Sequence, residues 1–489
     1  MALSNPTLAA IRFGYGLRPG EEPSADAEAL LAQIEEGVSR KPGFPREGAA
    51  GRLENATRVI SVLVAEAKAR QGGNPNDSIR KETQQEIQRT YRLDAMARVG
   101  NAVHSPLGFH ERLASFWVDH FSTSVLKSRP MRMIVPLYEA QAIRPNIGGS
   151  FSKLLSAAIL HPAMLIYLDQ NQSVGPDSPA GRRNRRGLNE NLGRELLELH
   201  TLGAGSGYTQ DDVRAAALVL TGLTVDNRTL EVVYQPRLAE GGPITLLDRT
   251  YQDDEGDGQD HVLMLEDLAA DPKTARHISG KLVRHFIADT PPDDMVEPMV
   301  DAWMKSRGNL TDVYRAMLSH PRAWSEPGRK IKQPFEFVVS GFRALGLPEK
   351  SFANLVRDMD DEEEGPVGKA MEMAGAVATR ENARRRAARA NALTLGALQR
   401  MGQPVWQPPS PAGFADEAGV WLSASQLSER IAWSRMIART FGQKMEPSEF
   451  LEAALGEAAR PETRQIVAQA PSKVHGITMV LASPEFNRR

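Results

Sequence analysis

The sequence contains no cysteine among its 489 residues. That absence excludes disulfide bonds, thiolate nucleophiles, and zinc or iron–sulfur sites with cysteine ligands. It does not identify a compartment, because a chain without cysteine behaves alike in oxidising and reducing surroundings. A metal site in this protein would have to use histidine and carboxylate ligands.

Long apolar runs are also absent. No stretch reaches the roughly 18 apolar residues that a transmembrane helix needs, so the sequence predicts no membrane span. Residues 1–22, MALSNPTLAAIRFGYGLRPGEE, lack the basic start and the apolar stretch of about 7–15 residues that make a signal peptide. On these grounds we expect a cytoplasmic protein.

Neither sign of charge dominates the chain. The formal net charge is -2, which gives no general attraction to nucleic acid or to an anionic membrane. We therefore expect no nucleic-acid partner. Hydrophobic residues make up 41% of the sequence, which is ordinary for a soluble globular protein and sufficient for a large core.

The common catalytic motifs are missing as well. The sequence has no G-x-S-x-G, no Walker loop, no G-x-G-x-x-G after a predicted strand, and no H-E-x-x-H. Function must therefore be sought in clusters of polar side chains rather than in a known signature.

Apolar residues recur with helical spacing through most of the chain. Leu30, Leu31 and Ile34 follow this pattern, and so do the apolar residues of FHERLASFWVDHF at 109–121. No internal repeat is present. The sequence predicts a mostly α-helical, multi-helical single body that spans residues 1–489.

Residues 224–251 form the strand-like part of the sequence. Leu230 and the run Val232 to Tyr234 favour a strand, and residues 243–247 could pair with it across the glycines at 241–242. We therefore expect one small β-hairpin that stands out from the helical body.

Residues 357–390 carry blocks of opposite charge. The acidic DMDDEEEGP is followed by the basic RENARRRAARANA. Blocks of this kind are typical of exposed segments. The sequence therefore predicts a mobile charged insertion here.

The stretch LNENLGRELLELHTLG, residues 188–203, has an unusual polar content for a short helix. At 100° per residue, Asn191, Arg194, Glu195 and Glu198 lie within an arc of about 100°, with leucines on both flanks. We call residues 189–202 the central polar helix. It is either a solvated surface helix with an Arg194–Glu198 pair at i, i+4, or a polar site inside a groove.

In the second interpretation the side chains of the central polar helix have chemical roles. Arg194 would hold an anionic group, and Glu195 and Glu198 would transfer protons or bind a cation, because two adjacent carboxyl groups can have well-separated pKa values. His120 and Asp119, at the end of the helix predicted before residue 121, complete the catalytic candidates.

The ligand-binding candidates surround the start of the same helix. GRRNRRG at 181–187 supplies a cationic approach through Arg185 and Arg186, and a helix start favours anions. Asn189 and Asn191 follow these arginines, and His161 would line the floor of the groove. His200 lies on the opposite side of the helix, near its C-terminus, where the dipole favours a cation.

The histidines also have a plain structural interpretation. His120 lies on the apolar face beside Trp117, where a core histidine is common. His161 precedes Pro162 at an expected helix break. A divalent-metal site built from Asp119, His120, His161, Glu195 and Glu198 is the alternative. It would require tertiary assembly, because the sequence spacing alone supplies no ligand pattern. No other cofactor is indicated.

Several segments together resemble a known family. They are RFGYGLRPGE at 12–21, WVDHF at 117–121, HPAMLIYLD at 161–169, GRRNRRGLNENLGRELLELHTLG at 181–203, GYTQDDV at 207–213, KTARHISGKLVRHFIADTPP at 273–292, KQPFEFVVSGFRALG at 332–346, MGQPVWQPPSPAGF at 401–414 and SPEFNRR at 483–489. The sequence is similar to the bacterial family called domain of unknown function 1800 along nearly its whole length.

The resemblance implies a single family unit and no particular reaction. Relatives often carry a twin-arginine export signal, which implies a periplasmic location for the family, and are often encoded beside a sulfatase-like protein, which implies such a partner. Where many relatives have tryptophan and asparagine around WxxHF, this chain has Asp119 before His120. A role for Asp119 would then belong to this branch of the family.

These observations lead to three hypotheses. The first is an enzyme or ligand-binding protein with its Arg, Glu and His site on the central polar helix. The second is a non-catalytic helical scaffold that presents the proline-rich loop 402–421, or the segment 357–390, to a partner protein. The third is a divalent-metal-dependent enzyme.

Overall fold

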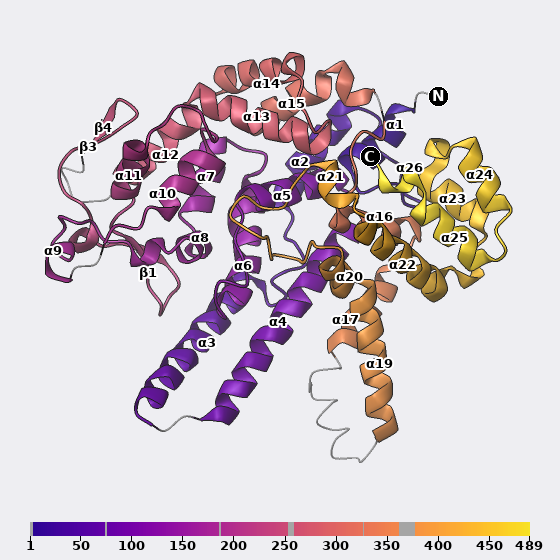
Figure 1. Ribbon diagram of the computed structural model, residues 1–489, viewed down its shortest axis with the longest axis horizontal. Coiled ribbons are helices and arrows are strands. Elements are labelled where there is room, and N and C mark those ends of the chain that lie inside the picture. Colours follow the sequence, from indigo (N-terminus) through magenta and orange to yellow (C-terminus); the bar gives the residue numbers. More distant parts are fainter. Residues whose placement is uncertain (1–2, 74–75, 185–186, 253–258, 326, 361–376) are drawn as a thin grey trace.

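The computed structural model describes residues 3–489 except 74–75, 185–186, 253–258, 326 and 361–376. Helices make up most of this part of the chain, and its strands form two short hairpins (Figure 1). The predicted mostly α-helical fold is therefore confirmed. None of the helices in the described ranges combines the length and the apolar character that crossing a bilayer requires.

The N-terminal segment ends in a buried helix, α5, which packs against α2 and η1. The elements are α1 (Asn5–Leu8), the π-helix η1 (Ala9–Phe13), α2 (Ala27–Ser39), α3 (Gly48–Gln71), α4 (Asp77–His104) and α5 (Gly108–His120). Phe109, Leu113, Phe116 and Trp117 of α5 are buried, as the apolar face of this segment predicts. Asp119, near the end of this helix, is half-buried.

The middle of the chain folds into short helices with two π-helical turns. They are α6 (Met131–Tyr138), η2 (Glu139–Ile143), η3 (Arg144–Asn146), α7 (Phe151–Ile159), α8 (Pro162–Tyr167), η4 (Gln170–Gln172), α9 (Gly181–Asn184), α10 (Asn191–Glu195), η5 (Leu196–His200) and α11 (Gln210–Val219). The predicted break at His161 and Pro162 separates α7 from α8. The central polar helix is thus an α-helical turn, α10, continued by a π-helical turn, η5.

The strands pair differently from the prediction. Strand β1 (Leu223–Val225) pairs with β2 (Val232–Tyr234), and β3 (Ile244–Leu246) pairs with β4 (Arg249–Tyr251), both antiparallel. The predicted pairing of the 230–234 strand with 243–247 is wrong. Leu247 and Asp248 both have positive φ, at 47° and 62°, so they close β3–β4 as a tight two-residue turn. Neither residue is the glycine that announces such a turn in a sequence.

The remaining helices follow the hairpins. They are α12 (Asp260–Ala270), α13 (Pro272–Phe286), α14 (Asp293–Ser306), α15 (Leu310–Ser319), α16 (Pro334–Ala344), α17 (Glu349–Asp360), α19 (Val377–Leu393), α20 (Leu395–Arg400), α21 (Ala418–Trp421), α22 (Ala424–Phe441), α23 (Pro447–Leu455), α24 (Pro461–Ala468), α25 (Lys473–Ala482) and α26 (Pro484–Asn487). The 3₁₀ turns η7 (Pro321–Trp324), η8 (Gly442–Lys444) and η9 (Gly456–Ala458) lie between some of them, and η6 (Pro236–Leu238) lies between β2 and β3.

Helix α16 is buried along its whole length. In Figure 1 it lies in the middle of the molecule beside α5, with the hairpins and α9–α12 on one side and α23–α25 on the other. The segment before α16 pairs with the end of the described chain through an isolated bridge between Ile331 and Arg488. The core around α5 and α16 therefore collects segments from distant parts of the sequence.

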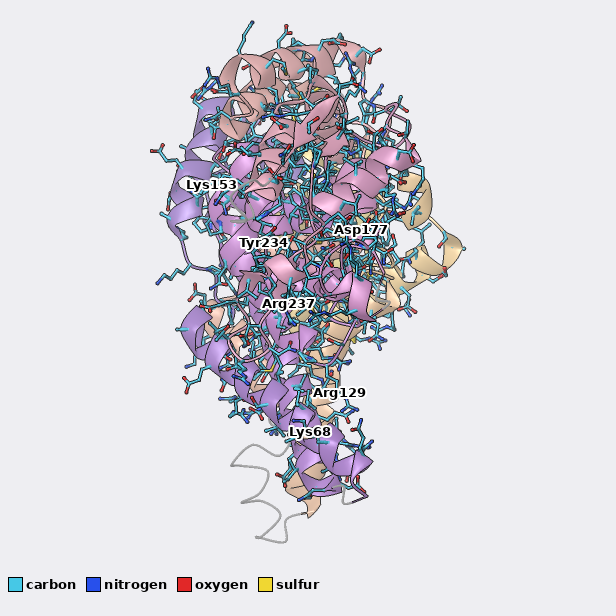
Figure 2. The ribbon with its side chains drawn as sticks, turned by 90° about the vertical axis from the view of Figure 1, so that its left-hand side faces the viewer. Lys68, Arg129, Lys153, Asp177, Tyr234 and Arg237 are labelled. Atoms are coloured by element: carbon cyan, nitrogen blue, oxygen red, sulfur yellow. The ribbon has the colours of Figure 1, made fainter. Side chains whose placement is uncertain are left out.

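Two helical pairs extend from this core. Helices α3 and α4 form one pair, and α17 and α19 form the other (Figure 1). In Figure 2, which shows the molecule from the side of the hairpins, Lys68 marks the projecting part of α3, while Tyr234 and Arg237 lie near Asp177 on the body. Backbone hydrogen bonds join the loop at 175–180 to 237–238 and explain that proximity.

The predicted charged insertion begins and ends in helices. Helix α17 contacts α4 and α19, and Arg89 of α4 pairs with Asp360. Arg386 lies 3.5 Å from Asp358 across the pair of helices. The acidic half of the insertion falls largely on residues 361–376, outside the described part of the chain, and its mobility stays a prediction.

Candidate functional site

The central polar helix does not form the ion pair predicted from its spacing. The Nη2 atom of Arg194 lies 3.3 Å from Glu190 Oε2 and donates to Gln210 Oε1 at 3.0 Å. The predicted Arg194–Glu198 pair is wrong, and the π-helical turn that begins at Leu196 gives the reason. A π-turn inserts an extra residue, so the side chains after it rotate relative to those before it.

The two glutamates of this helix still influence each other. Burial raises the pKa of Glu195, and the charge of Glu198 raises it further, while Arg194 opposes the rise. Tyr208 forms a side-chain hydrogen bond with Glu198. The polar face is thus partly paired within the protein and partly available.

The asparagines before the helix shape its first turn. Asn189 Oδ1 accepts a hydrogen bond from the backbone N–H of Asn191 at 2.9 Å, and its own N–H donates to Ser173 Oγ at 3.1 Å. Asn191 is exposed. Arg185 and Arg186 lie outside the described residues, so the cationic approach to this helix stays a prediction.

His161 is the N-cap of α8. Its Nδ1 atom accepts a hydrogen bond from the backbone N–H of Ala163 at 3.1 Å, and its ring contacts Tyr138 with 5.0 Å between the centroids. Burial lowers its pKa to about 3. His161 is therefore neutral at physiological pH and occupied by a structural hydrogen bond.

His120 and His200 form a reciprocal contact between α5 and η5. His120 Nε2 lies 3.3 Å from the carbonyl oxygen of His200, and His200 Nδ1 lies 3.2 Å from the carbonyl oxygen of His120. Burial, reinforced by the charge of Lys281, lowers the pKa of His120 well below its ordinary value and that of His200 to about 3. The expected cationic His200 is wrong, because burial outweighs the helix dipole.

The predicted metal set is not assembled. No group of three or more histidines and acidic residues with metal-binding geometry occurs in the ranges that the structure describes. His161 uses its Nδ1 atom as a helix cap, and the rings of His120 and His200 face backbone carbonyls. These contacts explain why the histidines do not converge with Glu195 and Glu198.

Asp119 lies instead in the wall of a different cleft, which we call the Asp119 cleft. Its cavity volume is about 60 Å³, and the space that includes the opening to solvent is about 640 Å³. It is lined by aromatic, hydroxyl, amide and ionisable side chains, which are Tyr15, Arg98, Ser115, Val118, Asp119, Ser122, Thr123, His285, Gln333, Phe335, Glu336, Gln403, Pro404, Val405, Trp406, Pro408 and Phe414. Such a mixture of apolar surface and a few polar groups is typical of small-molecule sites.

The proline-rich loop 402–421 closes one side of this cleft. Gly413 has φ of +82°, and a Cβ there would lie 2.6 Å from the backbone oxygen of Asp119, so only glycine allows this approach. The next N–H, of Phe414, donates to Asp119 Oδ1 at 2.8 Å. Trp406 and Trp421 are buried. The loop thus holds one carboxylate oxygen of Asp119 in place.

The environment of Asp119 changes its acidity. Burial raises the pKa of Asp119 to about 7, and Asp416 adds to the rise, while the Phe414 N–H, Lys281 and Arg98 oppose it. No hydrogen bond from another described residue reaches its Oδ2 atom. Asp119 is therefore close to half-protonated at neutral pH, with one oxygen available to a ligand.

Arg98 of α4 enters the cleft between two aromatic rings. Its guanidinium carbon lies 4.8 Å from the centroid of Phe335 and 5.7 Å from that of Trp406. Its Nε donates to Glu139 Oε2 at 2.7 Å. Within the described chain its two Nη atoms have no hydrogen-bond acceptor. Arg98 thus presents two N–H-bearing nitrogens to the cleft.

His285 of α13 forms a fixed pair with Asp416 of the loop. His285 Nδ1 lies 2.8 Å from Asp416 Oδ1, and Arg112 Nη2 lies 3.2 Å from His285 Nε2. Because an arginine only donates, Nε2 accepts and Nδ1 carries the proton that is donated to Asp416. His285 holds the pKa of Asp416 well below its usual range. His285 and Asp416 therefore form a polar pair of fixed orientation beside the Asp119 cleft.

Two hydroxyl groups, those of Tyr15 and Ser115, also line the Asp119 cleft. Tyr15 Oη and Ser115 Oγ are 2.8 Å apart, and burial raises the pKa of Tyr15 to about 12. Ser115 precedes Asp119 by one helical turn of α5. These hydroxyls supply neutral donors and acceptors to the cleft.

The fold and this cleft describe a multi-helical protein with a partly enclosed cleft lined by ionisable side chains. The chain belongs to the family described as Protein of unknown function (DUF1800), whose model matches residues 8–488. The resemblance seen in the sequence is therefore confirmed. No curated protein and no solved structure matches the chain.

The sequence pointed to Asp119 but not to the residues around it. Arg98, His285 and Asp416 come from a polar helix, an amphipathic helix and a loop, and nothing in their spacing relates them. A signal was present in the family resemblance, because the quoted segments at 273–292 and 401–414 contain His285 and the loop that covers Asp119.

Proposed function

We propose that the protein is an enzyme that binds a small molecule in the Asp119 cleft and transfers a proton to or from it. Asp119 would be the general acid or base. The observation that carries the proposal is a carboxyl group with a pKa of about 7 in the wall of a cleft. General acid–base catalysis is most efficient when the pKa of the group lies near the working pH.

The surroundings of Asp119 fit this role. The Phe414 N–H fixes Oδ1, which leaves Oδ2 to face a ligand in a defined direction. The His285–Asp416 pair and the Tyr15–Ser115 pair supply oriented dipoles in the same cleft. Preset dipoles of this kind stabilise charge that develops during a reaction.

The central polar helix is a second candidate for the reactive site. The observation that favours it is the mutual influence of Glu195 and Glu198, which raises the pKa of Glu195. Arg194 would then anchor an anionic group of the ligand. The two candidates can be separated, because they lie on different helices and depend on different carboxyl groups.

The test is a turnover assay without a known substrate. Wild-type protein, Asp119→Asn and the matched control Glu195→Gln are each incubated with a metabolite extract in D₂O. Mass spectrometry then identifies compounds that are consumed or that gain deuterium. We expect such compounds with the wild type and with Glu195→Gln, and none with Asp119→Asn.

The opposite pattern would favour the second candidate. If Glu195→Gln removes the turnover and Asp119→Asn keeps it, the reactive carboxyl group lies on the central polar helix. If all three proteins convert the same compounds equally, or none converts any, proton transfer at Asp119 is not the function.

The remaining predictions concern a scaffold role, a partner protein and the location in the cell. The scaffold hypothesis has the loop 402–421 as a docking element, whereas in the present proposal the same loop is a wall of the cleft, with its tryptophans buried. The sulfatase-like partner and the cytoplasmic or periplasmic location stay predictions.

A further inference from the structure

The inner wall of the Asp119 cleft carries a surplus of positive charge. Glu336 lines the cleft and faces Arg112 at 2.9 Å and Arg489 at 2.8 Å. Lys332 and Arg430 also interact with this one carboxylate. All of these side chains are buried, so water screens their charges poorly.

The pKa of Lys332 reflects this excess of positive charge. Burial, together with the charges of the three arginines, lowers the pKa of Lys332 to about 7, although Glu336 opposes the shift. A lysine loses its proton this readily where positive charge is already in excess. The wall behind Glu336 therefore favours an anion over a cation in the cleft.

Arg98 offers a geometric partner for such an anion. Its Nε atom is committed to Glu139, which also accepts hydrogen bonds from Arg144 at 3.0 Å and from Trp406 Nε1 at 2.7 Å. The hydrogen bond from Nε to Glu139 restricts the orientation of the guanidinium plane, and therefore the directions of its two Nη atoms. A planar two-oxygen group matches a guanidinium of this kind.

We propose that the ligand of the Asp119 cleft is an organic carboxylate, with its carboxylate group on the Nη atoms of Arg98 and its apolar part against Phe335 and Trp406. This inference rests on the proposed function for the location of the site. An organic carboxylate fits better than inorganic phosphate, because the guanidinium of Arg98 lies against the rings of Phe335 and Trp406, which can contact the apolar part of an organic acid.

The same arrangement couples ligand binding to the proton on Asp119. The charges that face Asp119 are Arg98 from α4, Lys281 from α13 and Asp416 from the loop. Arg98 also lowers the pKa of Tyr15, so its charge acts on both sides of the cleft. A bound carboxylate beside Arg98 adds negative charge near Asp119 and stabilises its protonated form. Binding should therefore weaken as the pH rises through 7.

The experiment compares matched ligands by isothermal titration calorimetry. The probes are two- to eight-carbon aliphatic and aromatic carboxylates such as butyrate and benzoate, their amides, benzylamine and inorganic phosphate. We expect at least one carboxylate to bind at least about tenfold more tightly than its amide. Arg98→Lys should reduce this preference, and Asp119→Asn should make the pH dependence of carboxylate binding between 6 and 8 shallower than in the wild type, with the titration of Lys332 accounting for the remainder.

Three results would overturn the proposal: no carboxylate binds, an amide or phosphate binds as tightly as the best carboxylate, or Arg98→Lys leaves the preference unchanged. Arg98→Lys keeps the buried charge opposite Glu139, and its folding is checked by circular dichroism. Should it fail to fold, the pH profile of Asp119→Asn decides alone, because a pH dependence as steep as that of the wild type contradicts the proposed contact.

The binding result is separate from the turnover result. Carboxylate binding without Asp119-dependent turnover would overturn the proposed enzyme and keep the ligand class. Asp119-dependent turnover of neutral compounds alone would keep the enzyme and overturn the ligand class.

Discussion

The central polar helix and the Asp119 cleft contain the same kinds of side chain in different surroundings. Arg194 remains 40% exposed and its partner Glu190 29% exposed, so water screens their charges. Arg98 and Asp119 lie in a cleft whose walls are aromatic rings and buried ion pairs. The helix has more charged residues in sequence, but the cleft has the carboxyl group whose pKa is shifted to about 7. The comparison teaches that enclosure, more than the number of charges, creates reactive groups.

The largest expected effect compares one arginine from each region. Arg144 is buried and pairs with Glu139 at 3.0 Å and with Glu111 at 2.8 Å, behind Arg98. Arg144→Met leaves buried carboxylates without their partner and should lower the free energy of unfolding by about 3–5 kcal/mol. Arg194→Met, the matched control, should lower it by less than about 1 kcal/mol. Urea denaturation measures both values. Equal losses would show that burial does not separate the two regions.

The next effect compares two glycines of the loop. Gly413→Ala forces a side chain onto a backbone with φ of +82° and into contact with Asp119, and should cost about 1–3 kcal/mol. Gly419 has nothing within 4 Å of its Cβ position, so Gly419→Ala should change stability by less than about 0.5 kcal/mol. Thermal denaturation gives both numbers. A tolerated Gly413→Ala would mean that the loop does not hold Asp119.

The smallest effect is on the pH dependence of stability. The pKa of Asp119 is about 7 in the folded protein and about 3.9 in an unfolded chain. Between these values the folded state holds a proton that the unfolded state has lost, so this group's contribution to stability falls as the pH rises through 7. Asp119→Asn should therefore gain on the order of 1–3 kcal/mol relative to the wild type between pH 5 and pH 8.

Glu195→Gln serves as the control for this measurement. Glu195 is only partly buried, and its pKa is raised by burial and by Glu198, so the same substitution there should change the pH dependence less. Urea unfolding at pH 5 and pH 8 tests both variants. A larger effect at Glu195 than at Asp119 would reverse the comparison.

The sequence predicted the parts of this structure that depend on local order. Helical spacing located α5, and the His161-Pro162 pair located the break between α7 and α8. Predictions from local sequence patterns were wrong where the backbone departs from regular α-helix or from a glycine-containing hairpin turn. The π-helical turn after Glu195 changed the partner of Arg194, and a turn without glycine changed the pairing of the strands.

The candidate site could be predicted from local sequence patterns only in small part. Asp119 was selected from its place beside His120, but its raised pKa comes from burial and from the charge of Asp416, which lies nearly 300 residues later in the sequence. No pattern within a window of one or two helices contains that information. His120 and His200 likewise contact backbone carbonyl groups of each other's segments, 80 residues apart, which no local pattern predicts.

The order in which the walls of the cleft occur along the chain has a consequence for how the protein matures. Tyr15, Arg98, Asp119, His285 and Trp406 come from five separate segments, and contacts between such distant segments require large loops to close, which makes them late events in folding. During synthesis, Asp119 leaves the ribosome almost 300 residues before the loop that covers it. Until that loop docks, Asp119 is an ordinary, water-exposed carboxylate. The raised pKa of Asp119 is thus a property that the chain acquires only on completing its fold.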